Sequence, residues 1–535
     1  MTRRGRFAAL VLILAVAAFL RYWGIAFGVP HHNARPDEPY IVLVALHMLR
    51  GDPNPQTFIY PTLFMYVVAA FYGAYYAVGH LLGSIQSVQA LRALWEQTPN
   101  SFLMTSRAIA AALGTATVLM VYLVGRQLFR YGVGIVSALF LSLTYLHVSQ
   151  SHFGLTDIPM TFMVLWAFLL ICRVRDDDNG GPLKTAGFVA GLAASTKYNA
   201  VLIGLPMTLA VLFRGGSHQS ESTTRRWVWP CVEFGSFLIA GFLVGTPFAI
   251  LNAPKFIADL KYQSAVLKEG HLFAVPDPAM YHVHITLWYG LGWPLLVSSL
   301  LGFAVLVRRD WRTALLVGAF PAAYYASISQ SRAVFVRYAD PLLPFLCLTA
   351  AVFVLWVGAY LLRGTSSRTR AAAIVGLSIA IIIPSAWKSV EFDRLVSRTD
   401  SRVLAGDWIQ ANIPTGQSLY LTGMGVYAQP ELPRDRYRLC RFDPLNSDFT
   451  CDTSIRELPD WILVSEYPLE AYSPPPPPQL QDVLARKYEV AKTFVAYRRQ
   501  AGDIFDRQDA FYLPFSGFSG VDRPGPNLVV YRRRE

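Results

Sequence analysis

Long apolar runs separated by short polar connections occupy most of the chain. The runs lie at about residues 7–28, 60–83, 104–124, 132–150, 158–173, 184–197, 199–213, 228–250, 286–306, 313–328, 338–361 and 370–388. Many of them approach the roughly 20 residues that an α-helix needs to cross the hydrocarbon core of a bilayer. The pattern therefore predicts a polytopic α-helical membrane domain over residues 1–388.

Residues 389–535 follow a different pattern. The stretch "VLAGDWIQANIP" is typical of an amphipathic helix that ends at Pro414, and "SPPPPPQ" is a polyproline tract expected on a surface loop. Three stretches, "QSLYLTG", "DWILVSEYP" and "PNLVVYRR", are typical of buried strands between turn residues. We predict a small soluble α/β or α+β domain here, outside the membrane.

The distribution of positive charge orients the predicted spans. Connections with at least two basic residues lie at 125–132, 172–184, 213–227, 307–312 and 362–370. The positive-inside rule places them in the cytoplasm, together with an N-terminus that carries Arg3, Arg4 and Arg6 before a retained first helix. The alternate connections and everything after residue 388 then lie outside.

Two segments after the first span are predicted not to cross. The stretch "PYIVLVALHMLRG" is too short to span and should lie along the interface. Residues 60–83 are rich in Tyr and Phe, which favours an interfacial or re-entrant helix. With both in the interface, within about residues 38–83, the chain has about eleven spans, N-terminus in and C-terminus out. The alternative is a true span at 60–83 with a further crossing elsewhere.

Composition agrees with a membrane protein. Hydrophobic residues make up 53% of the 535 residues and charged residues 15%, against about a quarter charged in soluble domains. The net charge of +12 fits basic cytoplasmic connections, and without a long basic tract we expect no nucleic-acid partner. Among the five cysteines, Cys440 and Cys451 can form a disulfide in an oxidising compartment. Two unpaired thiols are the alternative.

An acid pair follows the first apolar run. Asp37 and Glu38, with Arg35 beside them, stand between Pro36 and Pro39, which restrict the backbone. A solvated pair of loop acids is the simplest interpretation. However, the interfacial helix that follows would fix these carboxylates near the membrane surface, where one of them can act as a general base.

A second acid, Asp157, opens an apolar helix in "SHFGLTDIPM". Aspartate is favoured at the N-cap of a helix, so capping alone can explain it. A second acid on the same side as Asp37 also suits acid–base chemistry, because neighbouring charges set the pKa values of such groups.

Three cations lie on the predicted outer side. Lys197 is at the tip of two short helices, 184–197 and 199–213, whose length leaves it inside the protein, where a buried lysine needs an anionic partner. Arg332 and Arg337 lie in "SQSRAVFVRYADPLLP". All three can bind a phosphate through charge-assisted hydrogen bonds, or can instead extend towards lipid headgroups.

The sequence offers little other chemistry. His271 lies in the 251–285 connection, and His282 and His284 follow it, but no further ligand-type residues cluster there, so the signal for a metal site is weak. There is no Walker A motif and no dinucleotide-binding glycine motif. We expect no cofactor or metal, and an enzyme of this kind must take its activated substrate from the membrane.

Five stretches follow one another over about residues 1–350: "RPDEPYIVLVALHMLRGDPNPQTFIYPTLFMY", "RAIAAALGTATVLMVYLVGRQLF", "SHFGLTDIPMTFM", "GLAASTKYN" and "RYADPLLP". Together they resemble the polyprenyl-phosphate-dependent glycosyltransferases of the C-type superfamily. The likeness is greatest to the bacterial protein O-mannosyltransferase-like branch, which includes the lipid A aminoarabinose transferases. The resemblance implies a multi-pass protein of the bacterial inner membrane, with its active site facing the periplasm or exterior.

The resemblance also implies a reaction. The donor would be a polyprenyl-phosphate sugar, and the acceptor a hydroxyl group of a glycan, lipid or protein. Asp37, with Glu38 beside it, matches the acid that takes the acceptor proton, and Asp157 matches a second outer acid. Arg337 matches loosely a residue for the leaving phosphate, a role that we also assign to Lys197 and Arg332.

We also predict that His271 and Tyr60 lie in loops that contact the substrate.

Two other classes of function remain open. A secondary transporter would show paired repeats with interrupted helices, and no internal repeat is visible. A non-catalytic membrane scaffold with an outer binding domain would not require these acids and cations together.

Overall fold

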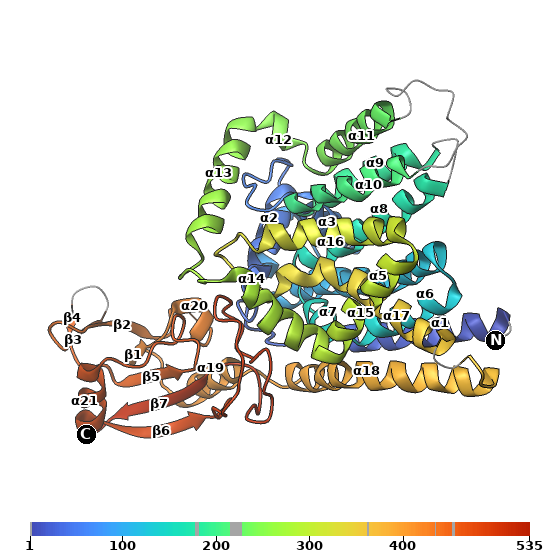
Figure 1. The fold of residues 1–535 in the computed structure, drawn as a ribbon. Helices are drawn as coiled ribbons and strands as arrows, with labels where there is room; N and C mark the ends of the chain where they lie inside the picture. The colour runs from blue at the N-terminus through green and yellow to red at the C-terminus, as the bar shows by residue number, and fades with distance from the viewer. Residues whose placement is uncertain (1–2, 177–180, 214–226, 361–362, 434, 452–454) are drawn as a thin grey trace. The chain divides into compact units, whose positions relative to one another are not determined.

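The computed structural model describes residues 3–176, 181–213, 227–360, 363–433, 435–451 and 455–535, which form two compact units (Figure 1). The helical unit comprises Met1–Trp23, Tyr40–Leu94 and Phe102–Val390. The sheet unit comprises Gly24–Pro39, Trp95–Ser101 and Glu391–Glu535. Two short N-terminal segments therefore fold with the C-terminal part, an arrangement that the pattern of apolar runs does not predict.

Helices dominate the first three hundred and ninety-six residues of the chain. They are α1 (Arg3–Tyr22), α2 (Glu38–Met48), α3 (Leu63–Leu81), α4 (Val88–Gln97), α5 (Asn100–Leu128), α6 (Tyr131–Leu143), α7 (Tyr145–Gln150), α8 (Asp157–Asp176), α9 (Gly181–Ala194), η1 (Tyr198–Ile203), α10 (Gly204–Leu212), α11 (Trp229–Gly245), α12 (Phe248–Leu251), α13 (Ala253–Glu269), α14 (Pro278–Tyr281), η4 (His282–Gly292), α15 (Trp293–Arg309), α16 (Trp311–Ile328), η5 (Val336–Leu342), α17 (Leu343–Tyr360) and α18 (Ser367–Val396).

Among the described residues, seven helical stretches are long and apolar enough to cross a membrane, and four shorter apolar helices accompany them. This confirms the predicted polytopic α-helical class. The count of eleven spans and their orientation stay predictions. Parts of three predicted cytoplasmic connections, residues 177–180, 214–226 and 362, lie outside the described residues. Helix α3 has the length and composition of a span, so its predicted interfacial placement also stays a prediction.

Several predicted boundaries differ from the structure. The apolar run at 132–150 is not one helix, because Thr144 is extended and the next amide, Tyr145 N–H, donates to Ser385 Oγ at 2.8 Å. The 251–285 connection contains the helix α13. Helix α18 continues through residue 388 to Val396.

Glycines allow α9 and α11 to pack at backbone distance. A Cβ atom on Gly191 would lie 2.0 Å from the Leu238 carbonyl oxygen, and one on Gly241 would lie 2.1 Å from the Phe188 carbonyl oxygen. Any larger residue at either position would force the helices apart. This close contact fixes the end of α9, from which the chain turns at Lys197 into η1.

Among the described residues of the sheet unit, seven strands form one sheet in the order β4-β3-β2-β1-β5-β7-β6, of which Figure 1 shows β1, β5, β7 and β6 in succession. β1 pairs in parallel with β2 and β5, and β7 pairs antiparallel with β5 and β6. The elements are α19 (Ser401–Asn412), β1 (Ser418–Leu421), α20 (Gly425–Ala428), β2 (Arg438–Asp443), β3 (Asp448–Cys451), β4 (Ile455–Arg456), β5 (Trp461–Glu466), α21 (Pro478–Lys487), β6 (Tyr488–Phe494) and β7 (Asn527–Arg533).

Alternate residues of β5 face two different cores. Leu463 packs with Ile409 of α19, whereas Ile462 and Val464 pack with Leu480 of α21. Because neighbouring side chains of a strand point to opposite faces, α19 and α21 cover opposite faces of the sheet. The predicted amphipathic helix and the three predicted strands are confirmed.

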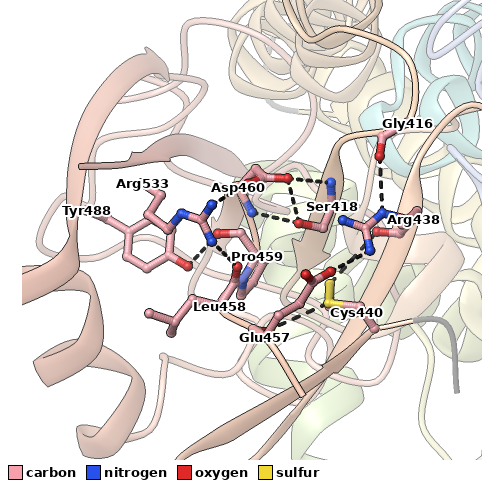
Figure 2. Close-up of a disulfide and its surroundings, with 11 residues drawn as sticks. Gly416, Ser418, Arg438, Cys440, Glu457, Leu458, Pro459, Asp460, Tyr488 and Arg533 are labelled. Carbon is pink, nitrogen blue, oxygen red and sulfur yellow. Dashed lines mark hydrogen bonds and ion pairs between the residues drawn. A yellow bond between two sulfur atoms is a disulfide. The ribbon is translucent and has the colours of Figure 1, made fainter. Parts of the chain in front are cut away.

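A disulfide joins β2 and β3. It links Cys440 and Cys451, which are directly paired across the two strands. Figure 2 shows Cys440 near polar contacts at the ends of the central strands β1, β5 and β7, where Asp460 accepts from Ser418 Oγ at 2.7 Å and from the Arg533 guanidinium at 2.8 Å. The disulfide that the sequence allows is therefore formed in the structure.

Candidate functional site

The helical unit holds a buried cluster of opposite charges. The Asp157 carboxylate forms an ion pair with Lys197 Nζ through Oδ1, and its Oδ2 lies 3.7 Å from Arg337 Nε. The side chains of Asp157 and Arg337 are each 6% exposed and that of Lys197 is 14% exposed. The lysine predicted to need an anionic partner thus has one.

Three separate elements bring these residues together. Asp157 is the first residue of α8, Lys197 has an extended backbone between α9 and η1, and Arg337 is the second residue of η5. Each lies at the end of a helix or in a short 3-10 turn, where the backbone can aim a long side chain inward.

Aromatic rings complete the surroundings of the two cations. Lys197 Nζ lies 4.3 Å from the centre of the Tyr338 ring, and Arg337 Cζ lies 4.1 Å from the centre of the Phe335 ring. The negative face of an aromatic ring attracts a cation, most strongly where water is excluded. The rings help to hold both cations in place beside Asp157.

A second acid, Asp340, belongs to the same cluster. It is fully buried, and neither of its carboxyl oxygens has a hydrogen-bond partner among the described residues. Its charge interacts with those of Asp157, Lys197 and Arg337. Sequence reasoning missed it, although the signal was present, because "RYAD" places an acid three residues after Arg337.

Tyr60 lies in a segment that is bound to the Lys197 turn. The Tyr198 hydroxyl donates to the Phe58 carbonyl at 2.8 Å, and Leu63 N–H donates to the Ser195 carbonyl at 3.0 Å. Tyr60 stands between these two anchors, with its ring 6.0 Å from that of Tyr40. The structure therefore brings the Tyr60 segment and the Lys197 turn together.

His271 and Arg332 lie at the edge of this region. Arg332 is exposed, and its backbone accepts from Val275 N–H at 3.3 Å, which fixes the 271–275 stretch. The His271 ring lies 5.6 Å from the Phe335 ring, which contacts Arg337. His271 is thus one aromatic ring away from the cluster, whereas Arg332 projects towards solvent.

Asp37 and Glu38 belong to the sheet unit and its junction with α2, so they are described separately. Asp37 is half-buried with φ at +70°, a left-handed conformation that is uncommon for a residue other than glycine. Glu38 is fully buried as the first residue of α2. Strained positions of this kind concentrate at functional sites, where the surroundings hold them.

The segment before Asp37 is held by a buried ion pair. Arg35, 1% exposed, pairs with Asp509, 6% exposed, and its guanidinium lies 5.4 Å from the centre of the Phe511 ring. The charge of Asp37 also contributes, after burial, to a raised pKa of the Tyr427 hydroxyl in α20. Tyr427 is itself held, because Arg402 Nη1 donates to its carbonyl at 2.6 Å.

Two histidines attach the same segment to Glu431. His32 Nδ1 lies 2.5 Å from Glu431 Oε2, and its backbone N–H donates to Oε1 at 2.6 Å. Burial lowers the pKa of His32, but the hydrogen bond and charge of Glu431 outweigh it, so the pKa is raised. Burial acts against ionisation of Glu431 too, yet the His32 hydrogen bond, followed by the electrostatic interactions with the two histidines, lowers its pKa.

His31 is held in its neutral form. Its Nε2–H donates to the Gln429 carbonyl at 2.9 Å, while Nδ1 accepts from Asn33 N–H at 3.2 Å. Burial, followed by the charge of Arg402, lowers its pKa to about 4, against the smaller opposing effects of Glu431 and Asp400. Sequence analysis did not single out these histidines, although "HHNARP" places them directly before the acid pair.

No group of three or more His, Cys, Asp or Glu residues suited to a metal ion occurs in the described part of the chain. His282 is buried with Nδ1 3.2 Å from Thr286 Oγ1, which explains it as a residue of the π-helical segment η4. The expectation that the protein needs no metal stays a prediction.

Comparisons with known proteins add an independent line of evidence. A family model described as dolichyl-phosphate-mannose-protein mannosyltransferase matches residues 100–244, a range that contains Asp157 and Lys197. A search of curated proteins finds no match.

Solved structures share the fold. ArnT from Cupriavidus metallidurans bound to undecaprenyl phosphate has 13% identity and a TM-score of 0.55, covering 99% of this chain and 98% of that chain. The apo state of the same ArnT has 14% identity and a TM-score of 0.53, with 97% coverage of both chains. The apo oligosaccharyltransferase of Archaeoglobus fulgidus has 15% identity and a TM-score of 0.51 over 77% of this chain, which spans only 59% of that protein's length.

The chain is a multi-pass membrane protein that shares its fold with ArnT and carries a small C-terminal sheet domain. The likeness to ArnT extends over nearly the whole length of both chains. Together with the match to the protein mannosyltransferase model, it confirms the resemblance to polyprenyl-phosphate-dependent glycosyltransferases that the sequence predicts.

Proposed function

We propose that this protein transfers a hexosyl or pentosyl unit from a polyprenyl-phosphate donor to an acceptor hydroxyl at the outer face of the bacterial inner membrane. The observation that carries the proposal is the pair of buried cations, Lys197 and Arg337, that converge on Asp157 within a fold shared with ArnT. The ArnT structure is of a protein bound to undecaprenyl phosphate.

The cation pair suits a leaving phosphate. Cleavage of the bond between the anomeric carbon and the phosphate oxygen leaves a second negative charge on the polyprenyl phosphate. Lys197 and Arg337 can stabilise that charge as it develops, because cations already fixed in a water-poor site need no reorganisation. Asp157 holds them in the absence of the donor and prevents two like charges from repelling each other.

Asp37 is proposed as the general base. It would accept the proton of the acceptor hydroxyl while that oxygen attacks the anomeric carbon from the side opposite the phosphate, so the sugar configuration inverts. The left-handed backbone of Asp37, the Arg35–Asp509 pair and the contacts of His32 with Glu431 would keep its carboxylate in position. No metal or cofactor is required in this scheme.

The disulfide supports an extracytoplasmic location of the sheet unit. Cys440 and Cys451 are paired, and structural disulfides form in oxidising compartments such as the periplasm. Because Asp37 belongs to the same unit, we place the reaction on that side of the membrane.

The test is consumption of donor by membranes that contain the protein. Radiolabelled polyprenyl-phosphate sugars and a cell-envelope extract as acceptor source are supplied to wild type, Asp37→Asn and the control Asp52→Asn, which changes the same charge at an exposed outer acid. We expect wild type and the control to consume one donor, which identifies the sugar, and Asp37→Asn to consume none at equal abundance.

Equal consumption by all three proteins would show that Asp37 is not the base. If none of them consumes any donor, although the extract supports transfer by a characterised glycosyltransferase, the proposed activity is wrong. The transporter and scaffold alternatives would then be examined.

A further inference from the structure

A large cavity lies in the sheet unit, on the face of the sheet that α21 covers. It has a volume of about 920 Å³ and is lined from β5, α21, β6, β7 and the polyproline tract. This volume is near the upper end of the roughly 300–1,000 Å³ range of small-molecule sites. None of the residues to which a role in transfer is assigned above lines it.

Flat rings form much of the lining. Four tyrosines contribute, and the Tyr467 and Tyr497 rings lie 5.3 Å apart. Pro475 and Pro476 of the polyproline tract also line the cavity. Rigid rings of this kind offer contact area at low conformational cost, and their faces suit the C–H faces of sugar rings.

One polar group of the lining lacks a partner. The Tyr467 side chain is only 7% exposed, and its hydroxyl makes no hydrogen bond within the described residues. Its neighbours are satisfied: Ser473 Oγ lies 3.1 Å from the Tyr512 hydroxyl, and the Tyr497 hydroxyl donates to Asp503 at 2.5 Å. A buried unpaired hydroxyl costs about 1–3 kcal/mol, so a ligand group that reaches it would gain a hydrogen bond.

The rim supplies both kinds of hydrogen-bonding group. Glu466, Glu470 and Glu489 provide exposed carboxylate acceptors, and Arg499 and Arg534 provide guanidinium donors. Three acids against two bases disfavour a phosphate or another polyanion. Sugar hydroxyls both donate and accept hydrogen bonds, so they can bind the carboxylates and the guanidinium groups. An apolar ligand would leave these groups without hydrogen-bond partners.

We propose that this cavity is a binding site for a neutral oligosaccharide. An extended peptide is the competing occupant, but peptides that join a sheet use the backbone groups of an open edge. This cavity lies on a sheet face and presents side chains. The proposal goes beyond the transfer reaction, because binding here needs neither Asp37 nor the donor.

The experiment uses the full-length protein in lipid nanodiscs without donor. It is applied to an array of short neutral, acidic and basic oligosaccharides, fragments of bacterial envelope glycans and short peptides, and hits are titrated up to millimolar concentration. The variants are Tyr467→Phe and Glu470→Gln. The matched controls are Tyr420→Phe in β1 and Asp482→Asn in α21, which make the same chemical changes in residues that do not line the cavity.

We expect neutral oligosaccharides to bind, and Tyr467→Phe to weaken binding by about 3- to 10-fold, the value of one neutral hydrogen bond. Glu470→Gln should weaken binding by about tenfold, because a charged acceptor makes a stronger bond. Both controls and Asp37→Asn should bind as wild type does, so that loss of transfer alone leaves this proposal intact. Binding of peptides in place of saccharides, binding that the cavity variants leave unchanged, or no binding across the array would overturn it.

Discussion

The ion pair of Arg35 and Asp509 provides the sharpest test of how the acid-bearing segment is held. Both side chains are almost fully buried, at 1% and 6% exposure. Asp509→Asn removes the negative charge from this buried pair, and breaking a buried ion pair from one side typically costs about 3–5 kcal/mol. For a unit of this size, 1 kcal/mol corresponds to about 2–4 °C, so we expect the Tm of the sheet unit to fall by about 10 °C.

The assay is thermal unfolding of the purified protein in detergent, followed by near-ultraviolet circular dichroism. The control is Asp482→Asn, which breaks the exposed pair with Arg486, where the side chains are 56% and 73% exposed. An exposed pair contributes at most about 1 kcal/mol, so this change should barely move the Tm. The double variant Arg35→Leu/Asp509→Leu should recover much of the loss, because both charges of the pair are removed together. If Asp509→Asn is no more destabilising than the control, the reasoning is refuted.

Further predictions concern the buried cations, pH and the disulfide. Lys197→Met removes one of two cations at Asp157, and polyprenyl-phosphate affinity in a filter-binding assay should fall by about tenfold or more, since a charge-assisted bond contributes ~1.5–3 kcal/mol. Between pH 6.5 and about 4, His31 is protonated in the unfolded chain but not in the folded chain. Acidification over this range should therefore lower the free energy of unfolding by about 3 kcal/mol, and His31→Asn should remove most of the resulting slope of Tm against pH. Cys440→Ser should lower the free energy of unfolding by ~2–3 kcal/mol in urea titrations, because Cys451 then no longer closes a loop.

Each of these has its own control. Lys184→Met changes an exposed lysine of α9 and should leave donor affinity unchanged. The pH experiment also includes a pair with the opposite dependence near neutral pH, because the pKa of His32 is raised and that of Glu431 is lowered. This pair stabilises the fold above about pH 4.5, and its contribution is lost as the pH rises past 6.5.

For the disulfide, the wild type in reducing agent should match Cys440→Ser. Normal donor binding by Lys197→Met would contradict the role of that lysine. An unchanged slope of Tm against pH in His31→Asn would contradict the assignment of His31, and a wild type whose stability reducing agent does not change would contradict the contribution of the disulfide.

The sheet domain could be predicted from sequence because its signals are local. The alternation in residues 460–468 and the proline at 414 mark a strand and a helix end without reference to the rest of the chain. The break at Thr144 could not be predicted, because the acceptor of the Tyr145 N–H group, Ser385 Oγ, lies 240 residues further along the chain. Helix α13 was missed because its sequence carries no long apolar run.

The same limit applies to the candidate site. The short helices around Lys197 predict that it is buried and needs an acid, but nothing local selects Asp157, 40 residues earlier, as that acid. Asp340 was overlooked because a single acid beside an arginine is usually a solvated pair, and only its full burial in the fold marks it as unusual. The partner of Arg35 lies in the last part of the chain, where sequence analysis had no reason to search.

The contact between His31 and Gln429 joins residues 398 positions apart, and it has a consequence for biogenesis. At about 5–20 residues per second, the ribosome needs on the order of a minute to make the intervening chain. During that time the segment around His31 has no contact with Gln429. The Asp37 segment therefore gains these contacts only after the last part of the chain has been made, so a protein whose synthesis stops early would lack the contacts that hold Asp37.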